Sequence, residues 1–405
     1  MYWAGCETRH DSFHPALRRL LRLQQCCAGG SHAFGYQLRR SVPPFAFFKF
    51  TAGYTGTGAA ALPNRSEPAV PYAQRSSKAE MPMTSPRGPV FIVGAPRSGT
   101  TLLQYMLRSH PALSLPTGES HFFIPLYRNA AHYGDLSQPD NVRRVLRAME
   151  AQSAEFLHTD LHGLKFDVEK LTIDFVAEGR STMRNIITGL FEKNAAGEGK
   201  PRWGDKTPYY VLHIPKLLEW WPDAQIIHIL RDGRDVALSM FSRRHDFGAY
   251  NSYYAAKLWE QYVETGHSLG QTVPKEQYLE LRYEDMIGDQ KTALQTICAF
   301  LGEAYSDSLL EYKKSGEAGK TPLLQKPIQK DNRNKWKTAM TSWQIRIFES
   351  AAATTLKEFG YPMTTPGKRL PIFLRALYRW HNAVVARWYR LYNPKKTPWT
   401  LPSPS

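Results

Sequence analysis

The sequence predicts an α/β fold in three layers, with a central parallel β-sheet flanked by helices. Two runs rich in apolar and β-branched residues, at 90–93 and 225–230, have the composition of buried strands, and 278–286 is interpreted as a third strand. A segment with helical spacing follows each of these runs. Alternation of buried strands and helices is typical of a sheet whose strands run parallel and are covered on both faces.

The first of these strands leads into a glycine-rich turn. VFIV at 90–93 is followed by a turn from Gly94 to Gly99, and TLLQYMLRSH from Thr100 onward has helical spacing. A strand, a glycine-rich turn and a helix form a P-loop-type phosphate site, in which backbone N–H groups point inward and the helix N-terminus adds partial positive charge. The arrangement therefore predicts a phosphate-binding loop.

This loop departs from the version that binds Mg–ATP. In that version a Lys reaches the terminal phosphates and a Ser or Thr hydroxyl holds Mg²⁺. Here Thr100 occupies the position of the Lys, Thr101 follows it, and Arg97 supplies a cation inside the loop instead. We therefore expect a site for a 5′-phosphate that lacks the equipment for a Mg–triphosphate.

A second strand and helix carry a cluster of charged residues. QIIHIL at 225–230 is followed by RDGRDVALSMFSRR, in which Asp235 falls near the start of the helix. Arg231 leaves the end of the strand, and Ser239 and Arg243 follow one and two turns into the helix on one face. Ligands of such sheets bind outside the carboxyl ends of the strands, so these three residues could converge on one anion. The alternative is a surface of salt-bridged arginines.

Further elements are expected around these strands. A short strand is predicted at 114–115, with Glu119 in the turn after it, and WGDKTP at 203–208 interrupts the helical pattern. The last helix of the folded domain is expected to begin at a Ser342 cap and to end near Gly360 and Pro362. Helical spacing predicts helices at 142–149, 167–178, 181–196, 209–221, 291–302 and 342–362.

Composition divides the chain into residues 1–85, 86–366 and 367–405. The first part is rich in Arg, poor in acidic residues and without a regular hydrophobic period. It is expected to be a disordered extension, with organelle targeting as one explanation. The other explanation is that translation begins at Met81 or Met83 rather than at Met1. The second part is expected to be the folded domain, and the third a basic, aromatic helix and tail.

The net charge of +16 predicts anionic partners such as nucleotides, sulfate or phosphate esters, or an anionic membrane. No motif of a nucleic-acid-binding module accompanies this charge, so nucleic acid is not expected as a partner. The four cysteines form no paired framework, which favours a reducing, cytoplasmic location. The sequence contains no run of about 18 apolar residues, so it predicts no transmembrane helix.

The C-terminal part contains a basic amphipathic segment. LPIFLRALYRWHNAVVARWYRLY, at 370–392, predicts a helix with an apolar stripe and with arginines that lie mostly off this stripe. Such a helix could rest on an anionic membrane, or pack on its own domain or on a second subunit. Packing is the favoured expectation. The stripe consists of Phe373, Leu377, Trp380, Val384, Trp388 and Leu391.

Taken together, PRSGTTLL, RDGRDVALS and YEDM resemble the motifs of sulfotransferases that use 3′-phosphoadenosine 5′-phosphosulfate (PAPS). The resemblance covers about residues 88–362, and its pattern is most similar to tyrosylprotein sulfotransferases and the related bacterial group. GESHFFIP also resembles the glutamate segment of heparan sulfate sulfotransferases. Animal tyrosylprotein sulfotransferases are membrane-anchored and disulfide-bonded, whereas neither feature is evident here, so peptide tyrosine, carbohydrate, lipid and small-molecule acceptors all stay open.

The resemblance implies a role for each matching residue. Glu119 would be the general base, Lys206 would support the leaving phosphate and the transferring sulfuryl group, and Tyr283 would lie near the adenine nucleotide. Lys335 would be the cation of a nucleotide-covering loop at 325–336, with Lys320 or Thr321 near a family serine. The 5′-phosphosulfate would be bound by Arg97, Ser98, Gly99, Thr100 and Thr101, and the 3′-phosphate by Arg231, Ser239 and Arg243.

The implied reaction is an in-line sulfuryl transfer to a hydroxyl, without a metal ion. Two rival functions stay open: a P-loop kinase or other NTPase, and a non-catalytic nucleotide- or membrane-binding module. At the level of single residues, Glu119 could be a structural carboxylate that caps a turn. Lys206 could form a surface ion pair with Asp205, its neighbour in the sequence.

Overall fold

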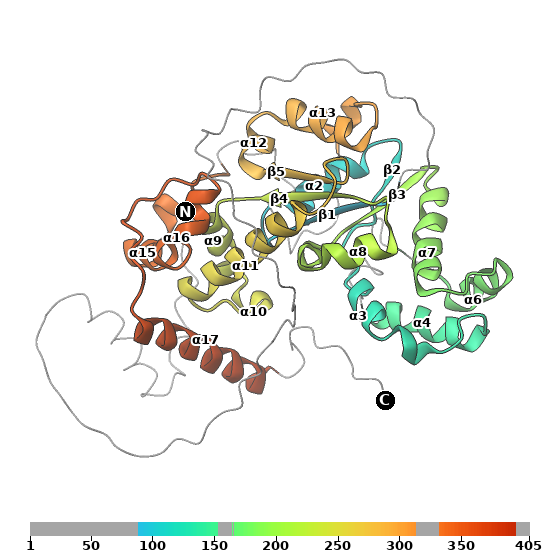
Figure 1. Cartoon of the computed structure of the whole chain (residues 1–405), viewed down its shortest axis with the longest axis horizontal. Coiled ribbons are helices and arrows are strands. Elements are labelled where there is room, and N and C mark those ends of the chain that lie inside the picture. Colours follow the sequence, from blue (N-terminus) through green and yellow to red (C-terminus); the bar gives the residue numbers. More distant parts are fainter. Residues whose placement is uncertain (1–87, 153–163, 165, 313–331, 394–405) are drawn as a thin grey trace, which may run out of the picture. The chain divides into compact units, whose positions relative to one another are not determined.

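The computed structural model describes residues 88–152, 164, 166–312 and 332–393. The N-terminal extension, Lys320, Thr321 and the last twelve residues, about which the sequence makes predictions, lie outside these ranges. Five parallel strands form one sheet in the order β2-β3-β1-β4-β5 (Figure 1). The strands are β1 (Val90–Gly94), β2 (Leu113–Ser114), β3 (Arg202–Lys206), β4 (Gln225–Leu230) and β5 (Tyr278–Arg282). The predicted α/β fold with a central parallel sheet is confirmed.

Helices connect the strands and cover the sheet. Between β1 and β3 they are α2 (Thr100–Arg108), α3 (Phe123–Arg128), η1 (Ala130–Tyr133), α4 (Pro139–Gln152), α6 (Val168–Ala177) and α7 (Met183–Gly197). Between β3 and β5 they are η2 (Pro208–His213), α8 (Ile214–Trp220), α9 (Gly233–Ser242), α10 (Arg244–Phe247) and α11 (Ser252–Gly270). After β5 they are α12 (Tyr283–Gly288), α13 (Gln290–Leu301), η3 (Asp307–Leu309), α14 (Trp336–Ala339), α15 (Ser342–Ala351), α16 (Ala353–Glu358) and α17 (Ile372–Tyr392).

Alternating side chains of the central strand belong to two separate cores. Phe91 and Val93 of β1 pack in one cluster with residues of α7, α8 and α11, whereas Val90 and Ile92 pack in another with α2, α12 and α13. Successive side chains of a strand point to opposite faces of the sheet, so this division means that both faces are buried. Figure 1 shows α12 and α13 on one side of the strands and α8 and α11 on the other.

The strand β3 was not expected from the sequence, where WGDKTP was interpreted only as an interruption. It pairs with β1 on one side and β2 on the other, and all five residues of RWGDK are buried. Three of these five residues are charged, so the segment does not have the apolar pattern of a buried strand. Arg202 is tolerated there because its guanidinium donates to the carbonyls of Gly88 (2.8 Å) and Leu301 (3.0 Å).

Two predicted helices are each divided in the structure. Residues 209–221 form η2 and then α8, because Pro215 lies in the first turn of α8, where its missing N–H is tolerated. Residues 342–362 form α15 and α16, with a break at Ala352. The cap of α15 is Thr341 rather than Ser342, since Thr341 and Gln344 form a reciprocal capping box.

Candidate functional site

The turn after β1 has the backbone conformation of an open anion cradle. Arg97 (φ 72°) and Gly99 (φ 98°) lie in the left-handed region, and Ser98 N donates to Ala95 O at 3.1 Å. Helix α2 then begins at Thr100, and Gly99 offers no side chain to cap it. The Ser98 hydroxyl is buried and has no hydrogen-bond partner among the residues that the structure describes. Uncapped amides and an orphaned buried hydroxyl fit a phosphate group.

Tyr283, the first residue after β5, closes one side of this turn. A Cβ atom on Gly99 would overlap the ring of Tyr283, so both the contact and the positive φ require glycine at this position. The guanidinium of Arg231 lies 4.3 Å above the same ring, and Asn332 Nδ2 donates to the Tyr283 hydroxyl at 2.7 Å. The ring is therefore held between the glycine-rich turn after β1 and the residue that follows β4.

Arg231 and Ser239 reach the loop from the next strand and helix. Arg231 Nη1 donates to the carbonyl of Arg97 (3.0 Å), and Arg97 Nε donates to Ser239 Oγ (2.9 Å). Arg231 Nη2 donates to Asn332 O at 3.0 Å, while its Nε is buried without a partner in the described ranges. The structure thus brings together Arg97, Arg231 and Ser239 at one edge of the sheet.

The site concentrates positive charge. Burial lowers the pKa of Arg97, and the nearby charges of Arg243 and Arg231 lower it further. Arg243 caps the C-terminus of α9 and forms an ion pair with Asp246 at 2.6 Å, so it lies at the margin of this group. Arginines that disfavour one another's charge are stabilised when an anion binds among them.

The segment around Lys335 is fixed against α9. Asp235 accepts hydrogen bonds from the backbone N–H groups of Asn334 (2.7 Å) and Trp336 (2.9 Å), on either side of Lys335. The buried guanidinium of Arg234 lies 3.7 Å from the centre of the Trp336 ring. From the sequence, Asp235 was expected only to complement the helix dipole. Its side chain also anchors the 332–336 segment beside Arg231 and Tyr283.

Glu119 and Lys206 meet at the ends of β2 and β3. Lys206 Nζ donates to Glu119 Oε1 at 2.9 Å, and His121 Nε2 lies 2.8 Å from Glu119 Oε2. Burial raises the pKa of Glu119, but the charge of Lys206 and the hydrogen bond and charge of His121 outweigh it and hold the pKa well below its usual range. The proposed surface pair of Lys206 with Asp205 is wrong: the Lys206 side chain is buried and is paired with Glu119.

A small hydrogen-bond network positions the turn that carries Glu119. Ser120 N donates to Thr207 Oγ1 at 3.0 Å, and the hydroxyls of Ser120 and Tyr210 are 2.9 Å apart. Tyr210 also accepts from Phe123 N at 3.0 Å. Sequence reasoning missed Thr207, Tyr210 and His121 (φ 52°) as site residues. The signal in the sequence was that each lies within four residues of Lys206 or Glu119.

The two groups of residues share one edge of the sheet. The arginine loop follows β1, Arg231 follows β4, and Tyr283 follows β5, while Glu119 and Lys206 follow or end β2 and β3. Glu119 is close enough to Arg97 for its negative charge to raise the pKa of Arg97, which counters part of the lowering by burial. Strand order reverses between β1 and β4, and such a switch point is where open parallel sheets bind ligands.

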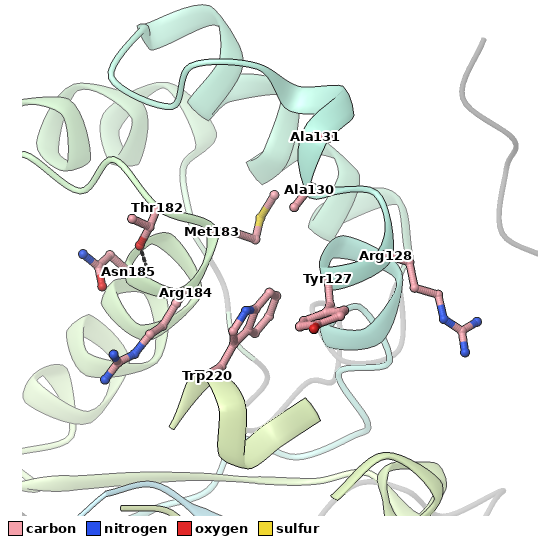
Figure 2. Close-up of a pocket in the computed structure, with 9 residues that line it drawn as sticks. All are labelled: Tyr127, Arg128, Ala130, Ala131, Thr182, Met183, Arg184, Asn185 and Trp220. Atoms are coloured by element: carbon pink, nitrogen blue, oxygen red, sulfur yellow. Dashed lines mark hydrogen bonds between the residues drawn. The ribbon is translucent and has the colours of Figure 1, made fainter. Parts of the chain in front are cut away.

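A separate pocket lies among α3, η1, the start of α7 and the end of α8. In Figure 2, Tyr127, Met183 and Trp220 point into it, whereas the guanidinium groups of Arg128 and Arg184 point away. The rings of Tyr127 and Trp220 lie 5.2 Å apart. The pocket is therefore largely apolar, and neither Glu119 nor any residue of the arginine cluster lines it.

Asp205 gives the site a measurable pH dependence. Burial raises its pKa from 3.8 to about 6, although the hydroxyls of Thr207 and Ser120 counter part of this effect. Between pH 3.8 and about pH 6, the native state holds a proton that the unfolded chain has released. The free energy of unfolding therefore falls as the pH rises through this range, and it does not recover above it. The charged, buried carboxylate of Asp205 lowers the free energy of unfolding by about 3 kcal/mol at pH 7.5, and we expect Asp205→Asn to remove this loss. At pH 4, where the native carboxyl is protonated, we expect the substitution to remove almost nothing. Urea unfolding of both proteins at the two pH values measures this, and a difference independent of pH would contradict it.

The chain is similar in sequence to known proteins. A sequence model described as "Sulfotransferase family" matches residues 89–307, more than half of the chain. The protein-tyrosine sulfotransferase of Drosophila melanogaster is 24% identical over 242 residues, which are 58% of this chain and 41% of that relative. Protein-tyrosine sulfotransferase 2 of Gallus gallus is 24% identical over 272 residues, or 64% of this chain and 63% of the relative. The chain thus spans less than two thirds of the length of either.

Among solved structures, the sulfotransferase domain from the Synechococcus PCC 7002 olefin synthase superimposes with a TM-score of 0.46 and 24% identity. The superposition covers 71% of this chain and 100% of that domain.

Proposed function

Since this chain belongs to the sulfotransferase family, we propose that it transfers a sulfuryl group from PAPS to an acceptor hydroxyl. The observation that carries this proposal is the convergence of the loop after β1 with Arg231 and Ser239. PAPS has anionic groups at the 5′ and 3′ positions of one adenosine. A donor of this kind needs two neighbouring anion sites at the same edge of the sheet.

The residues fit the two ends of this donor. The amides and hydroxyls of 97–101 would hold the 5′-phosphosulfate, and the buried Ser98 Oγ, which has no partner in the part of the chain that the structure describes, supports this assignment. Arg231, Ser239 and Arg243 would hold the 3′-phosphate, for which the Nε of Arg231, without a partner among the described residues, is an available donor. Tyr283 would lie against the nucleoside, and Lys335 would act from the segment that Asp235 anchors.

Glu119 and Lys206 would carry the chemistry. Glu119 would take the proton of the acceptor hydroxyl, and Lys206 would stabilise the negative charge that develops on the bridging oxygen of the leaving bisphosphate. Glu119 is a weak base while Lys206 is bonded to it, because that contact lowers its pKa. Movement of Lys206 towards the leaving phosphate would raise the pKa of Glu119, so donor binding would activate the base.

The acceptor is proposed only as a class, a hydroxyl group. Two relatives are named protein-tyrosine sulfotransferases, which makes a peptide tyrosine the first acceptor to test, followed by carbohydrates, lipids and small phenols. A P-loop kinase or NTPase is less well supported, since Thr100 stands where such sites need Lys and the strand ends carry Arg231 and Tyr283 rather than acids.

A thermal-shift panel on the full chain tests the proposed donor. Adenosine 3′,5′-bisphosphate at about one hundred times its Kd is expected to stabilise the protein by about 2.7 kcal/mol, a shift of a few degrees in Tm. ATP with Mg²⁺ at the same concentration is expected to give a smaller shift. A larger shift with ATP–Mg²⁺ would contradict the proposal and favour the NTPase function. Transfer of labelled sulfate from PAPS then tests each acceptor class.

A further inference from the structure

Helix α17 is held on the domain by one face, which combines hydrogen bonds with the packing of Tyr378 and Leu374 against Tyr253 and Ile347. Asn382 Oδ1 accepts from Tyr250 N, and Asn382 Nδ2 donates to Gly248 O, both at 2.8 Å. The backbone oxygen of Tyr378 accepts from Asn251 Nδ2 at 2.9 Å, and the same helix face stacks Tyr389 on His245. Figure 1 shows α17 beside α10 and α11, the elements that follow α9. These contacts fix which side of the helix faces the domain.

The apolar stripe of α17 lies outside these contacts. Its six residues are 41% to 69% exposed: Phe373, Leu377, Trp380, Val384, Trp388 and Leu391. The expectation that this stripe packs on its own domain is therefore not met within the described residues, because Asn382 and Tyr378 on another face make that contact. A contiguous exposed apolar surface of this length marks an interaction site rather than scattered exposure.

The charge around the stripe selects its partner. The last acidic residue of the chain is Glu358, and the segment from 359 to 405 contains eight Lys and Arg residues and no Asp or Glu. Two copies of this helix facing each other across a twofold axis would bring like charges together. An anionic lipid surface offers opposite charge along the whole length, and Trp side chains favour the boundary between lipid and water. None of the helices in the described ranges is long and apolar enough to cross a bilayer.

We propose that α17 docks the protein onto an anionic lipid surface, with the helix lying in the interface. The apolar stripe is inserted among the lipids, and Arg387 and Arg390 contact the headgroups. Because Asn382 and Tyr389 fix the opposite side of the helix to residues 245–251, docking also sets the orientation of the catalytic domain on the membrane. This inference does not depend on the proposed sulfuryl transfer.

Vesicle co-sedimentation of the full chain tests the proposal. We expect binding to vesicles of phosphatidylcholine with 30% phosphatidylglycerol, and at least tenfold weaker binding to phosphatidylcholine alone. Leu377→Ser with Leu391→Ser is expected to weaken binding to the anionic vesicles at least tenfold without changing the charge. The matched control, Ile173→Ser with Leu310→Ser, removes two exposed aliphatic side chains elsewhere and is expected to bind normally. Arg387→Gln with Arg390→Gln is expected to weaken binding and to reduce its dependence on salt.

Three outcomes would overturn the proposal. The first is undiminished vesicle binding by the Leu377→Ser, Leu391→Ser variant, which would mean that net charge alone binds the lipid. The second is equal binding to neutral and anionic vesicles. The third is a dimer of the wild-type chain in analytical ultracentrifugation that this variant converts to a monomer, because a second copy would then occupy the stripe. Near-identical Tm values for all variants ensure that the comparison is between folded proteins.

Discussion

Replacing Glu119 with Gln is expected to remove sulfuryl transfer while leaving adenosine 3′,5′-bisphosphate bound. The amide keeps the size of the side chain and can still accept a hydrogen bond from Lys206 Nζ, which lies 2.9 Å from Oε1 in the native protein. It cannot take a proton from the acceptor hydroxyl. General-base catalysis contributes about 10²- to 10⁴-fold, so kcat is expected to fall by that factor. Single-turnover transfer from PAPS measures the loss, and thermal shift with the bisphosphate measures binding.

The control for this substitution is Glu198→Gln. Glu198 forms an ion pair with Arg108 at 3.0 Å, so this change also neutralises a partly buried, paired glutamate, but outside the candidate site. Its kcat is expected to stay within about twofold of the wild type. Normal turnover of the Glu119→Gln variant would rule out the base assignment. Loss of bisphosphate binding instead would assign Glu119 to holding Lys206 in place.

Replacing Arg231 with Met is expected to weaken binding of adenosine 3′,5′-bisphosphate by about 10- to 100-fold, which is the effect of losing charge-assisted hydrogen bonds. Binding of 5′-AMP, which has no 3′-phosphate, is expected to change much less. Met retains much of the apolar stem over the Tyr283 ring, from which the guanidinium carbon is 4.3 Å away. Titrations of both nucleotides on the full chain give the ratio of the two losses.

Ser239→Ala separates the phosphate role of this cluster from its structural role. Arg231 also donates to the carbonyls of Arg97 and Asn332, so its removal can disturb the loop itself. Ser239 supplies one hydroxyl, which accepts from Arg97 Nε at 2.9 Å. Its loss is expected to reduce bisphosphate affinity by about tenfold and to leave 5′-AMP nearly unchanged. Equal losses for both nucleotides in both variants would count against a 3′-phosphate site.

Strand prediction succeeded where one apolar run determined the structure. VFIV and QIIHIL are buried on both faces, and this demands continuous apolar sequence, so β1 and β4 were found from composition. RWGDK failed the same criterion although it is buried between two other strands. Its charges are compatible with that position only because Arg202 finds carbonyl oxygens and Lys206 finds Glu119, partners that lie 87 or more residues away in sequence.

The candidate site shows the same contrast between residues that local sequence could place and residues that contacts with distant segments placed. The rule that the carboxyl ends of parallel strands share an edge predicted that Arg231, Ser239 and Arg243 converge. In the structure Arg231 and Ser239 both contact Arg97, whereas Arg243 pairs with Asp246 at the margin of this group. The partner of Lys206 did not follow, since Asp205 is its neighbour in sequence. Adjacent residues of a strand point to opposite faces, so Lys206 turns away from Asp205 and meets Glu119 at the end of another strand.

The sequence by itself determined the parallel sheet, the glycine-rich turn between β1 and α2, the identity of the charged residues and the existence of an amphipathic C-terminal helix. Each of these depends on local composition or spacing, which a single chain segment carries. Only the tertiary structure decided that Glu119 is bonded to Lys206 and His121, that Asp235 holds the segment around Lys335, and that α17 meets the domain through Asn382 and not through its apolar stripe. These contacts join residues from separate elements, and their hydrogen-bonding groups are satisfied only when the whole sheet and its helices are in place.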